Sequence, residues 1–249
     1  MIQVVTTFSK DGYELYGKRM IETWLSYWPT TDYQLIVYVE DFDLNENNYE
    51  IIQRDIYECC PELIDFKKAS MEMIANHPND GKYEKRIQKT IKWSHKVFVN
   101  YHAITHCDTN YLIFLDGDTY TTNVVPSNFA EELCGEDLLA VHFEMLMQGL
   151  HFETGLLIFN TRHERIEEFA KLYISGYHNL EIYERPKTWD SFWLVHLYKT
   201  YSLPIKNLGW KYSKRAFPNE LVRTILEHDV GPEKYKNLGY NRYTGKKLI

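Results

Sequence analysis

The sequence predicts an α/β protein in which helices flank a mixed, mostly parallel central sheet, and two observations support that prediction. Tyr111–Leu115 is an unbroken run of five apolar residues rich in strand formers, as expected for a strand buried on both faces. The chain also opens with strand, helix and strand patterns at 2–8, 16–28 and 34–39. Such a βαβ opening favours a parallel sheet whose ligands bind beyond the carboxyl ends of the strands.

The chain has 249 residues, enough for one large α/β domain, and no repeat, low-complexity segment or linker divides it, so we expect a single domain over 1–249. No apolar stretch approaches the ~20 residues of a membrane-spanning helix. The N-terminus lacks the basic and apolar regions of a signal peptide, and the four cysteines form no CxxC pair. These features favour a cytoplasmic protein, in the host cytoplasm if the chain is viral.

Hydrophobic periodicity predicts the elements of the first half in order. The opening helix ends at Pro29, because proline and the polar residues after it stop the helical pattern. Helices are then expected at 46–59 and 62–76. A long helix is expected at 84–107, with an apolar face along its length and basic residues in its early turns. A short helix at 126–132 follows the central strand.

The second half continues the alternation of strands and helices. Strands are expected at 138–142 and 152–160, a helix at 164–173, and a further helix beginning at Trp189-Asp190. Asp190 fits the N-cap position of that last helix. The stretch 204–226 predicts irregular structure. The glycine-containing tail 227–249 predicts a loop folded over a site.

Two carboxylates, Asp116 and Asp118, follow the central apolar run directly. An unpaired carboxylate is too costly to bury, so we expect both in the crevice beyond the end of the strand. Gly117 between them removes a side chain and allows a sharp turn that aims both carboxylates at one point. Hard oxygen ligands suit Mg²⁺ or Mn²⁺ bound together with phosphate oxygens. The alternative is an Asp-Gly-Asp turn that only ends a strand; the buried run before it favours the metal site.

The net charge of −7 is unevenly distributed. The segment 82–102 holds six Lys/Arg and one acidic residue, a charge of +5. The segment 206–249 holds ten Lys/Arg and four acidic residues, a charge of +6. The rest of the chain therefore carries a charge of −18. Segregation of this size indicates that the two basic segments face an anionic partner, with duplex DNA as one alternative. A solvated helix face is the other interpretation of 82–102.

Two motifs give the sequence a resemblance to the glycosyltransferases of the GT-A fold, which implies a single Rossmann-like domain. Their Asp-x-Asp motif at a strand end matches 116–118, and the run 228–234 reads His-x-x-Gly-x-x-Lys. The second motif is similar to the C-terminal motif of retaining enzymes such as glycogenin and bacterial galactosyltransferases. The chain looks similar to small bacterial or viral members of this group. Tyr235-Lys236 replace the usual Pro-Trp after the motif.

The resemblance assigns roles residue by residue. It implies that Asp116, Asp118 and His228 bind Mn²⁺ (or Mg²⁺), and that Gly231 and Lys234 lie at the donor diphosphate. Further matches place a nucleotide-binding half in about 1–120, and an acceptor half with the closing tail in about 121–249. The implied donor-binding residues of the first half are Thr6, Thr7 and Phe8 at the base and ribose, Arg86 and Lys96 near the phosphates, and Asp116 with Gly117. Glu153 and Asp190 are expected beside the donor sugar.

The implied function is metal-dependent transfer of a sugar from a nucleoside diphosphate sugar, expected to be a UDP-sugar, to a hydroxyl acceptor with retention. Retention needs a nucleophile on the far face of the sugar or a leaving group that deprotonates the acceptor, and Glu153 and Asp190 are the candidate nucleophiles. The acceptor stays open between a glycan or protein and a hydroxylated base in DNA, which would have to be flipped out. The alternatives are an inactive protein that binds nucleotide sugars and a metal-dependent phosphoesterase, which would need more metal ligands.

Overall fold

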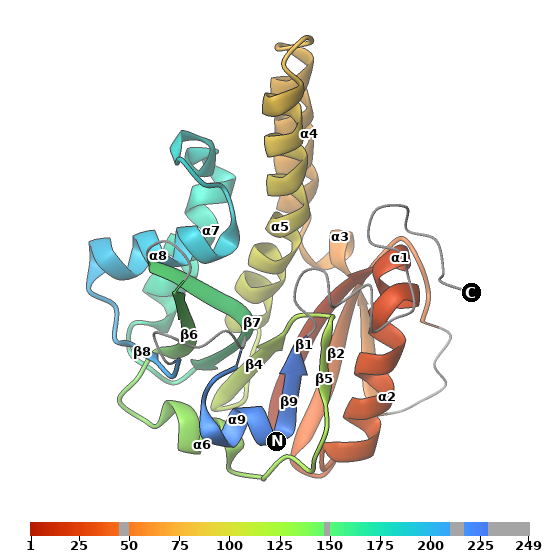
Figure 1. The fold of residues 1–249 in the computed structure, drawn as a ribbon, viewed down its shortest axis with the longest axis vertical. Coiled ribbons are helices and arrows are strands. Elements are labelled where there is room, and N and C mark those ends of the chain that lie inside the picture. Colours follow the sequence, from red (N-terminus) through yellow and green to blue (C-terminus); the bar gives the residue numbers. More distant parts are fainter. Residues whose placement is uncertain (45–49, 147–149, 210–216, 229–249) are drawn as a thin grey trace.

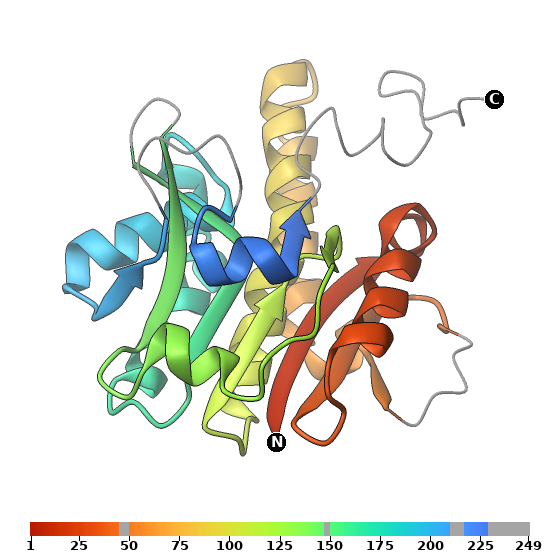
Figure 2. The same cartoon turned by 60° about the horizontal axis from the view of Figure 1, so that its bottom comes forward.

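The computed structural model describes residues 1–44, 50–146, 150–209 and 217–228. A seven-stranded mixed sheet, in the order β3-β2-β1-β4-β7-β6-β8, runs through the molecule with helices on both faces (Figures 1 and 2). The predicted class is therefore confirmed. The strands are β1 (Ile2–Ser9), β2 (Tyr33–Glu40), β3 (Ile51–Asp55), β4 (Tyr111–Leu115), β6 (Ala140–Leu146), β7 (Leu150–Asn160) and β8 (Ile205–Asn207).

The sheet has a parallel part and a part in which β7 runs the other way. β1 pairs in parallel with β2 and β4, and β2 pairs in parallel with β3. β7 is antiparallel to both β4 and β6, and β6 is parallel to β8. Since β4 pairs in parallel with β1 and antiparallel with β7, it lies at the boundary between the two parts. All five residues of β4 are buried, as its unbroken apolar run predicts.

Helices fill two hydrophobic layers, one on each face of the sheet. One layer is formed with α3 (Ile56–Cys59), α4 (Glu62–Ala75), α5 (Gly81–Thr105), α7 (Ile166–His178), the short 3-10 helix η2 (Glu181–Glu184) and α8 (Asp190–Tyr201). The other is formed with the π-helical turn η1 (Tyr13–Gly17), which follows the short helix α1 (Lys10–Gly12), and with α2 (Lys18–Tyr27), α6 (Phe129–Cys134) and α9 (Glu220–Ile225). None of the described helices is long and apolar enough to cross a membrane.

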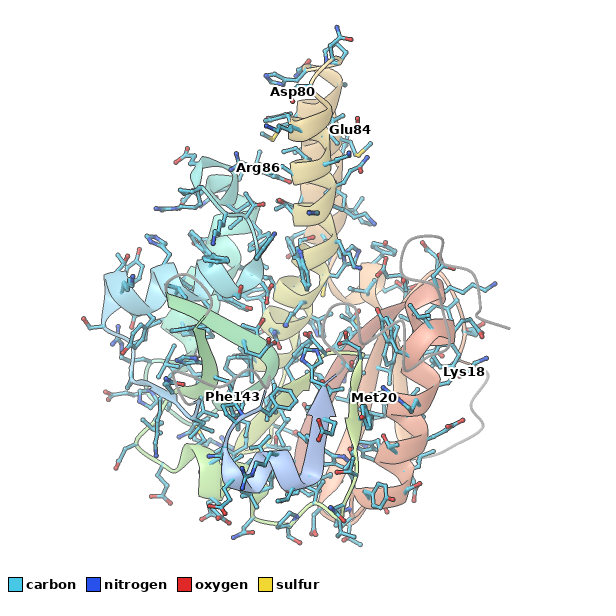
Figure 3. All side chains as sticks on the ribbon, in the orientation of Figure 1. Lys18, Met20, Asp80, Glu84, Arg86 and Phe143 are labelled. Carbon is cyan, nitrogen blue, oxygen red and sulfur yellow. The ribbon has the colours of Figure 1, made fainter. Side chains whose placement is uncertain are left out.

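The antiparallel pair α4 and α5 extends well beyond the sheet, as Figure 1 shows. Asp80 stands at its tip (Figure 3), where its carboxylate accepts hydrogen bonds from the backbone N–H groups of Lys82 and Tyr83 and so caps α5. The lower part of α5 packs against β1, α7 and α8. One end of α5 therefore packs in the core, and its other end is exposed.

A second, two-stranded sheet lies over the carboxyl end of β4. β5 (Thr119–Thr121) pairs antiparallel with β9 (Leu226–His228), and Thr119 stands opposite His228. This pairing fixes the end of the described chain next to the turn that follows β4.

Three expectations about elements are corrected by the structure. The helix expected at 46–59 is wrong over Ile51–Asp55, which forms β3 at the edge of the sheet, because pairing with β2 satisfies its backbone. Within 50–59, the part of this range that the structure describes, the helix is confined to Ile56–Cys59. The stretch 204–226 contains β8 and α9, the latter capped by Asn219. The tail begins as the strand β9; its remainder, 229–249, lies outside the described residues.

Candidate active site

The turn after β4 is held by backbone hydrogen bonds and by close packing. The N–H of Asp116 donates to the carbonyl of Gly155 on β7 at 2.8 Å, and the N–H of Thr119 donates to the carbonyl of Asp116 at 2.9 Å. A Cβ at Gly117 would stand 2.5 Å from Cε1 of Phe8, so only glycine fits without displacing that ring. Close packing under the turn thus explains the glycine between the two aspartates.

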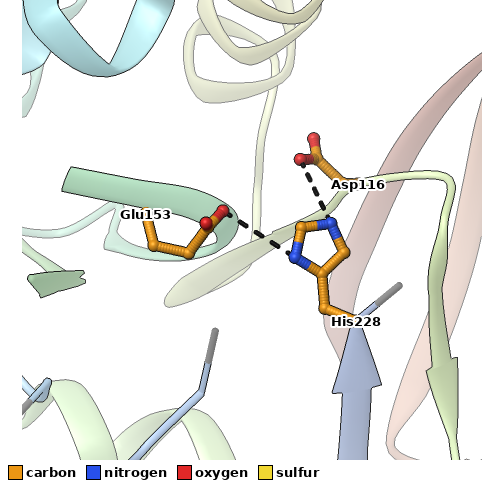
Figure 4. Close-up of side chains that lie close together, drawn as sticks. All are labelled: Asp116, Glu153 and His228. Carbon is orange, nitrogen blue, oxygen red and sulfur yellow. Dashed lines mark ion pairs between the residues drawn. The ribbon is translucent and has the colours of Figure 1, made fainter. Parts of the chain in front are cut away.

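Asp116 and Asp118 meet His228 and a third acid, Glu153. Nε2 of His228 lies 3.0 Å from Oδ1 of Asp118 and 3.8 Å from Oδ2 of Asp116, and its Nδ1 lies 3.8 Å from Oε1 of Glu153. Figure 4 shows Asp116, Glu153 and His228 converging from the turn after β4, from β7 and from β9, respectively. One ligand atom from each of these three lies within 4.8 Å of the others. The three predicted metal ligands therefore lie at one place, but the group whose ligand atoms lie within 4.8 Å of one another contains Glu153 in place of Asp118.

The three carboxylates set the charge of the imidazole. Burial alone would lower the pKa of His228, but Asp118, Glu153 and Asp116 outweigh it and raise that pKa to about 9. The pKa of Asp116 is raised to about 6, because burial and Asp118 together outweigh the opposing charges of Lys96 and His228. Without a metal ion, His228 is a cation at neutral pH.

Lys96 joins this cluster to Asp190. Nζ of Lys96 is buried 2.8 Å from Oδ1 of Asp116 and 3.3 Å from Oδ2 of Asp190, and it donates to Oγ1 of Thr154 at 2.9 Å. That hydroxyl donates in turn to Oδ2 of Asp190 at 2.7 Å. Burial lowers the pKa of Lys96, but Asp116 and Asp190 reverse the shift and raise it above its usual value. Lys96 is therefore a fixed positive charge in the site.

Asp190 has a different structural role from the one expected. Trp189 occupies the N-cap position of α8, and Asp190 is the first residue within the helix. Its carboxylate is buried and bound by Lys96 and Thr154 rather than by backbone N–H groups of the helix. The N-cap interpretation is therefore wrong, and Asp190 faces the site.

A cavity of about 820 Å³ contains the cluster, a volume suited to a ligand the size of a nucleotide sugar. It lies at the carboxyl ends of β1, β2 and β4, where the sequence predicted a ligand site. The predicted site residues that line it are Thr7, Lys96, Asp116, Gly117, Asp118, Glu153, Asp190 and His228.

The other predicted site residues are placed elsewhere. Thr6 is fully buried beside the cavity, and Phe8 lies beneath Gly117 as part of the core. The guanidinium of Arg86 donates to the carbonyls of Tyr183 and Arg185, and Arg86 lines a separate cavity. Gly231 and Lys234 lie outside the described residues.

A further pair in the cavity wall, Glu40 and His95, was not predicted to have a role in the site. Oε2 of Glu40, at the end of β2, lies 3.2 Å from Nε2 of His95 on α5. Burial raises the pKa of Glu40, but the hydrogen bond and charge of His95 outweigh it and lower that pKa. The sequence shows that β2 ends in an acidic residue, but no motif or spacing connects Glu40 with His95, 55 positions later.

Together the sheet order, the crossing strand β7 and the acid–histidine cluster at the end of β4 define a protein with the GT-A fold of glycosyltransferases. The sequence matches no protein-family model and no curated protein. Solved structures do match. Mouse xyloside xylosyltransferase 1 superposes with a TM-score of 0.54 at 10% identity, over 84% of this chain and 85% of that one.

A second similar structure is a glycosyltransferase involved in the glycosylation of the major capsid of PBCV-1. Its TM-score is 0.50 at 16% identity, and the match covers 95% of this chain and 96% of that one. The glycosyltransferase GlyE of Streptococcus pneumoniae matches with a TM-score of 0.50 at 12% identity, over 83% of this chain and 44% of that one. These likenesses confirm the predicted GT-A fold.

Proposed function

We propose that this protein is a metal-dependent glycosyltransferase that moves a sugar from a nucleoside diphosphate sugar, with uridine as the expected base, to a hydroxyl acceptor with retention. One observation supports the proposal above all. Within a GT-A fold, the cluster of Asp116, Asp118, Glu153 and His228 lies beside a buried lysine in a cavity of nucleotide-sugar size.

The residues of the cluster fit a divalent cation. Carboxylate oxygens with one imidazole nitrogen suit Mn²⁺, and Mg²⁺ less well. Three acids around one histidine also leave an excess of negative charge that a cation would neutralise. We infer that Asp116, Asp118 and His228 hold the ion. Glu153 offers a ligand atom within 4.8 Å of those of Asp116 and His228, and Asp118 lies 3.0 Å from His228. When bound, the ion neutralises the charge that develops on the diphosphate leaving group.

The protein side chains supply positioning and fixed charge. Lys96 is held between Asp116 and Asp190, so it adds a positive charge near the donor diphosphate without reorganisation. Asp190 is fixed in orientation by Lys96 and Thr154. Glu153 accepts a hydrogen bond from the N–H of Gly155 at 2.9 Å, which directs its carboxylate toward His228. Both acids line the cavity, so both stay candidates for the carboxylate that approaches the anomeric carbon in a retaining reaction.

A screen of nucleotide sugars for Mn²⁺-dependent hydrolysis tests the proposal. We expect turnover of at least one donor and its loss on chelation. Asp118→Asn should lower turnover by about 100-fold or more, because it deletes one ligand charge while keeping the volume of the side chain. Asp137→Asn, an exposed position remote from the cluster, is the matched control and should retain wild-type turnover.

Full activity in the Asp118→Asn enzyme, or activity that survives chelation, would contradict the metal mechanism. Thermal unfolding of both variants shows whether the fold is intact. The same assays address the two alternative functions. An inactive binding protein would bind UDP with Mn²⁺ but hydrolyse no donor, and a phosphoesterase would cleave a generic phosphodiester. No observation from the structure favours either alternative.

A further inference from the structure

A second, basic cavity adjoins the first. It has a volume of about 240 Å³, and no acidic residue lines it. Its wall consists of Lys82, Lys85, Arg86 and Lys89 from α5, and Pro186, Lys187, Thr188 and Trp189 from the segment before α8. Trp189 also lines the larger cavity, so the two cavities share one side chain.

The four lysines of this wall carry positive charge that the described protein does not neutralise. Lys82, Lys85, Lys89 and Lys187 are exposed, and none has an ion-pair partner among the residues that the structure describes. Glu84, the acid within the first turns of α5, lies on the opposite side of the helix (Figure 3). Like charges held this close repel one another, and a bound anion would relieve that repulsion.

The wall is held in place by hydrogen bonds between its two segments. Figure 3 shows Arg86 on the side of α5 that faces α7 and η2, where its guanidinium donates to the carbonyls of Tyr183 and Arg185. Four residues along, the hydroxyl of Thr90 donates to that of Thr188. Nε of Arg86 is buried and has no hydrogen-bond partner within the described ranges. The hydrogen bonds of Arg86 and Thr90 thus make the cavity a fixed feature of the fold.

Trp189 supplies an apolar surface between the two cavities. Its side chain is 37% exposed although it directly precedes the buried Asp190. An aromatic face of this kind packs against the apolar face of a sugar ring. A ring on Trp189 would have the donor cavity on one side and the lysines on the other.

We propose that the basic cavity is an acceptor subsite, and that the acceptor is a glycan carrying an oxyanion, either a phosphate, a sulfate or a carboxylate. The lysines bind the oxyanion while Trp189 packs against the adjoining ring, which directs a hydroxyl of the acceptor toward the donor sugar. The part about transfer rests on the proposed glycosyltransferase function; the binding of the anionic glycan does not.

Size and charge favour a glycan over duplex DNA. A volume of about 240 Å³ fits one ring with its charged substituent, whereas duplex DNA needs an extended band of phosphate contacts. The net charge of −7 also repels a long polyanion outside the cavity.

The test is calorimetric binding at low salt of four tetrasaccharides: tetragalacturonate, a heparin tetrasaccharide, a phosphorylated maltotetraose and neutral maltotetraose. We expect at least one anionic probe to bind and the neutral one not to bind at the same concentration. The ranking of the three anionic probes identifies the oxyanion. The triple variant Lys82→Gln/Lys85→Gln/Lys89→Gln should weaken that binding about tenfold or more. Trp189→Ala should weaken it about tenfold as well.

The matched control is Lys68→Gln/Lys171→Gln/Lys199→Gln, which removes the same charge from exposed positions elsewhere and should change binding by less than about twofold. The proposal is overturned if no anionic probe binds, if the neutral probe binds as well, or if both triple variants weaken binding equally. Tighter binding of a short duplex DNA than of every anionic glycan, lost in the cavity variant, would overturn it in favour of a nucleic-acid acceptor.

Binding of UDP with Mn²⁺ to the same proteins separates the two proposals. The cavity triple variant should retain wild-type affinity for UDP and Mn²⁺, because none of its three lysines lines the larger cavity. Wild-type protein that binds an anionic glycan but no UDP would contradict the proposed function and leave the subsite standing. Loss of UDP binding in the cavity variant would show that the lysines serve the donor, which overturns the subsite.

Discussion

His228 is the residue whose charge state controls the candidate site. Its pKa of about 9 means that, without a metal ion, the imidazole holds a proton at pH 7–8 among Asp118, Glu153 and Asp116. A nitrogen that binds a metal must first lose that proton. The proton and the divalent cation therefore compete for the same cluster of carboxylates.

This competition predicts that Mn²⁺ binding releases about one proton at pH 7–8. Because His228 is deprotonated only above pH 9, Mn²⁺ affinity should rise with pH up to that value. It should fall more steeply below pH 6, where Asp116 also takes up a proton. Calorimetry in buffers of different ionisation enthalpy measures the proton count. His178→Asn, at an exposed position, is the control: its binding of Mn²⁺ should release the same number of protons as binding to the wild-type protein. Absence of proton release near pH 7.5 would mean that His228 is not a ligand.

The side chains that could be predicted are those tied to a local pattern. Asp116 and Asp118 follow an apolar run, and His228 has a fixed spacing to Gly231 and Lys234. The contact of Glu153 with His228 could not be predicted, because it depends on which face of β7 meets β9. Likewise the partnership of Lys96 with both Asp116 and Asp190 combines three elements that no local pattern connects.

At the scale of elements, α5 explains why one of its two predicted phosphate-binding residues lies outside the donor cavity. Arg86 and Lys96 are ten residues apart, which on a helix is about 15 Å along the axis and about 80° in direction. Lys96 reaches the cluster, and Arg86 lies beside η2.

The strands β5 and β9 were not predicted for another reason. Each has three residues, too few for an alternating pattern, and their pairing joins residues that are more than 100 positions apart, such as Thr119 and His228.

The packing of β7 against β9 yields a prediction for Gly155→Ala. The added Cβ would lie 2.8 Å from Cε1 of His228, which is closer than a carbon–carbon contact allows, so the imidazole must leave its present position. We expect Mn²⁺ affinity to fall about tenfold or more, as it does when groups that orient metal ligands are lost. Titration of Mn²⁺ by calorimetry measures the effect, and thermal unfolding confirms that the sheet is intact.

Gly81→Ala is the control for this substitution, because a Cβ at Gly81 has no atom within 4 Å. It should leave Mn²⁺ affinity unchanged. If Gly155→Ala also leaves that affinity unchanged in a folded protein, the position of His228 in the structure is not the position from which it binds metal.

At the scale of the whole molecule, the site connects the parts of the fold. Asp116 follows β4 of the parallel part, Glu153 comes from β7, Asp190 from α8 and His228 from β9. The sequence predicted three strands of the parallel part, β1, β2 and β4, from their long apolar runs, but not the edge strand β3. It could not predict the order β4-β7-β6-β8, since hydrophobic periodicity identifies a strand but not the strand beside which it lies in the sheet.

Because the ligands come from so many elements, binding at the site should stabilise the fold as a whole. Ligand at about 100 times its dissociation constant adds about 2.7 kcal/mol to the free energy of unfolding. For a chain of this size that corresponds to a rise in Tm of about 5–10 °C. We expect this rise with UDP and Mn²⁺ together, measured by calorimetric melting, and little with UDP alone. His228→Ala and chelation should abolish it, whereas Asp137→Asn should retain it. An equal rise with UDP in the absence of metal would show that the nucleotide binds through the protein alone. The acid–histidine cluster would then not bind the diphosphate through a metal ion.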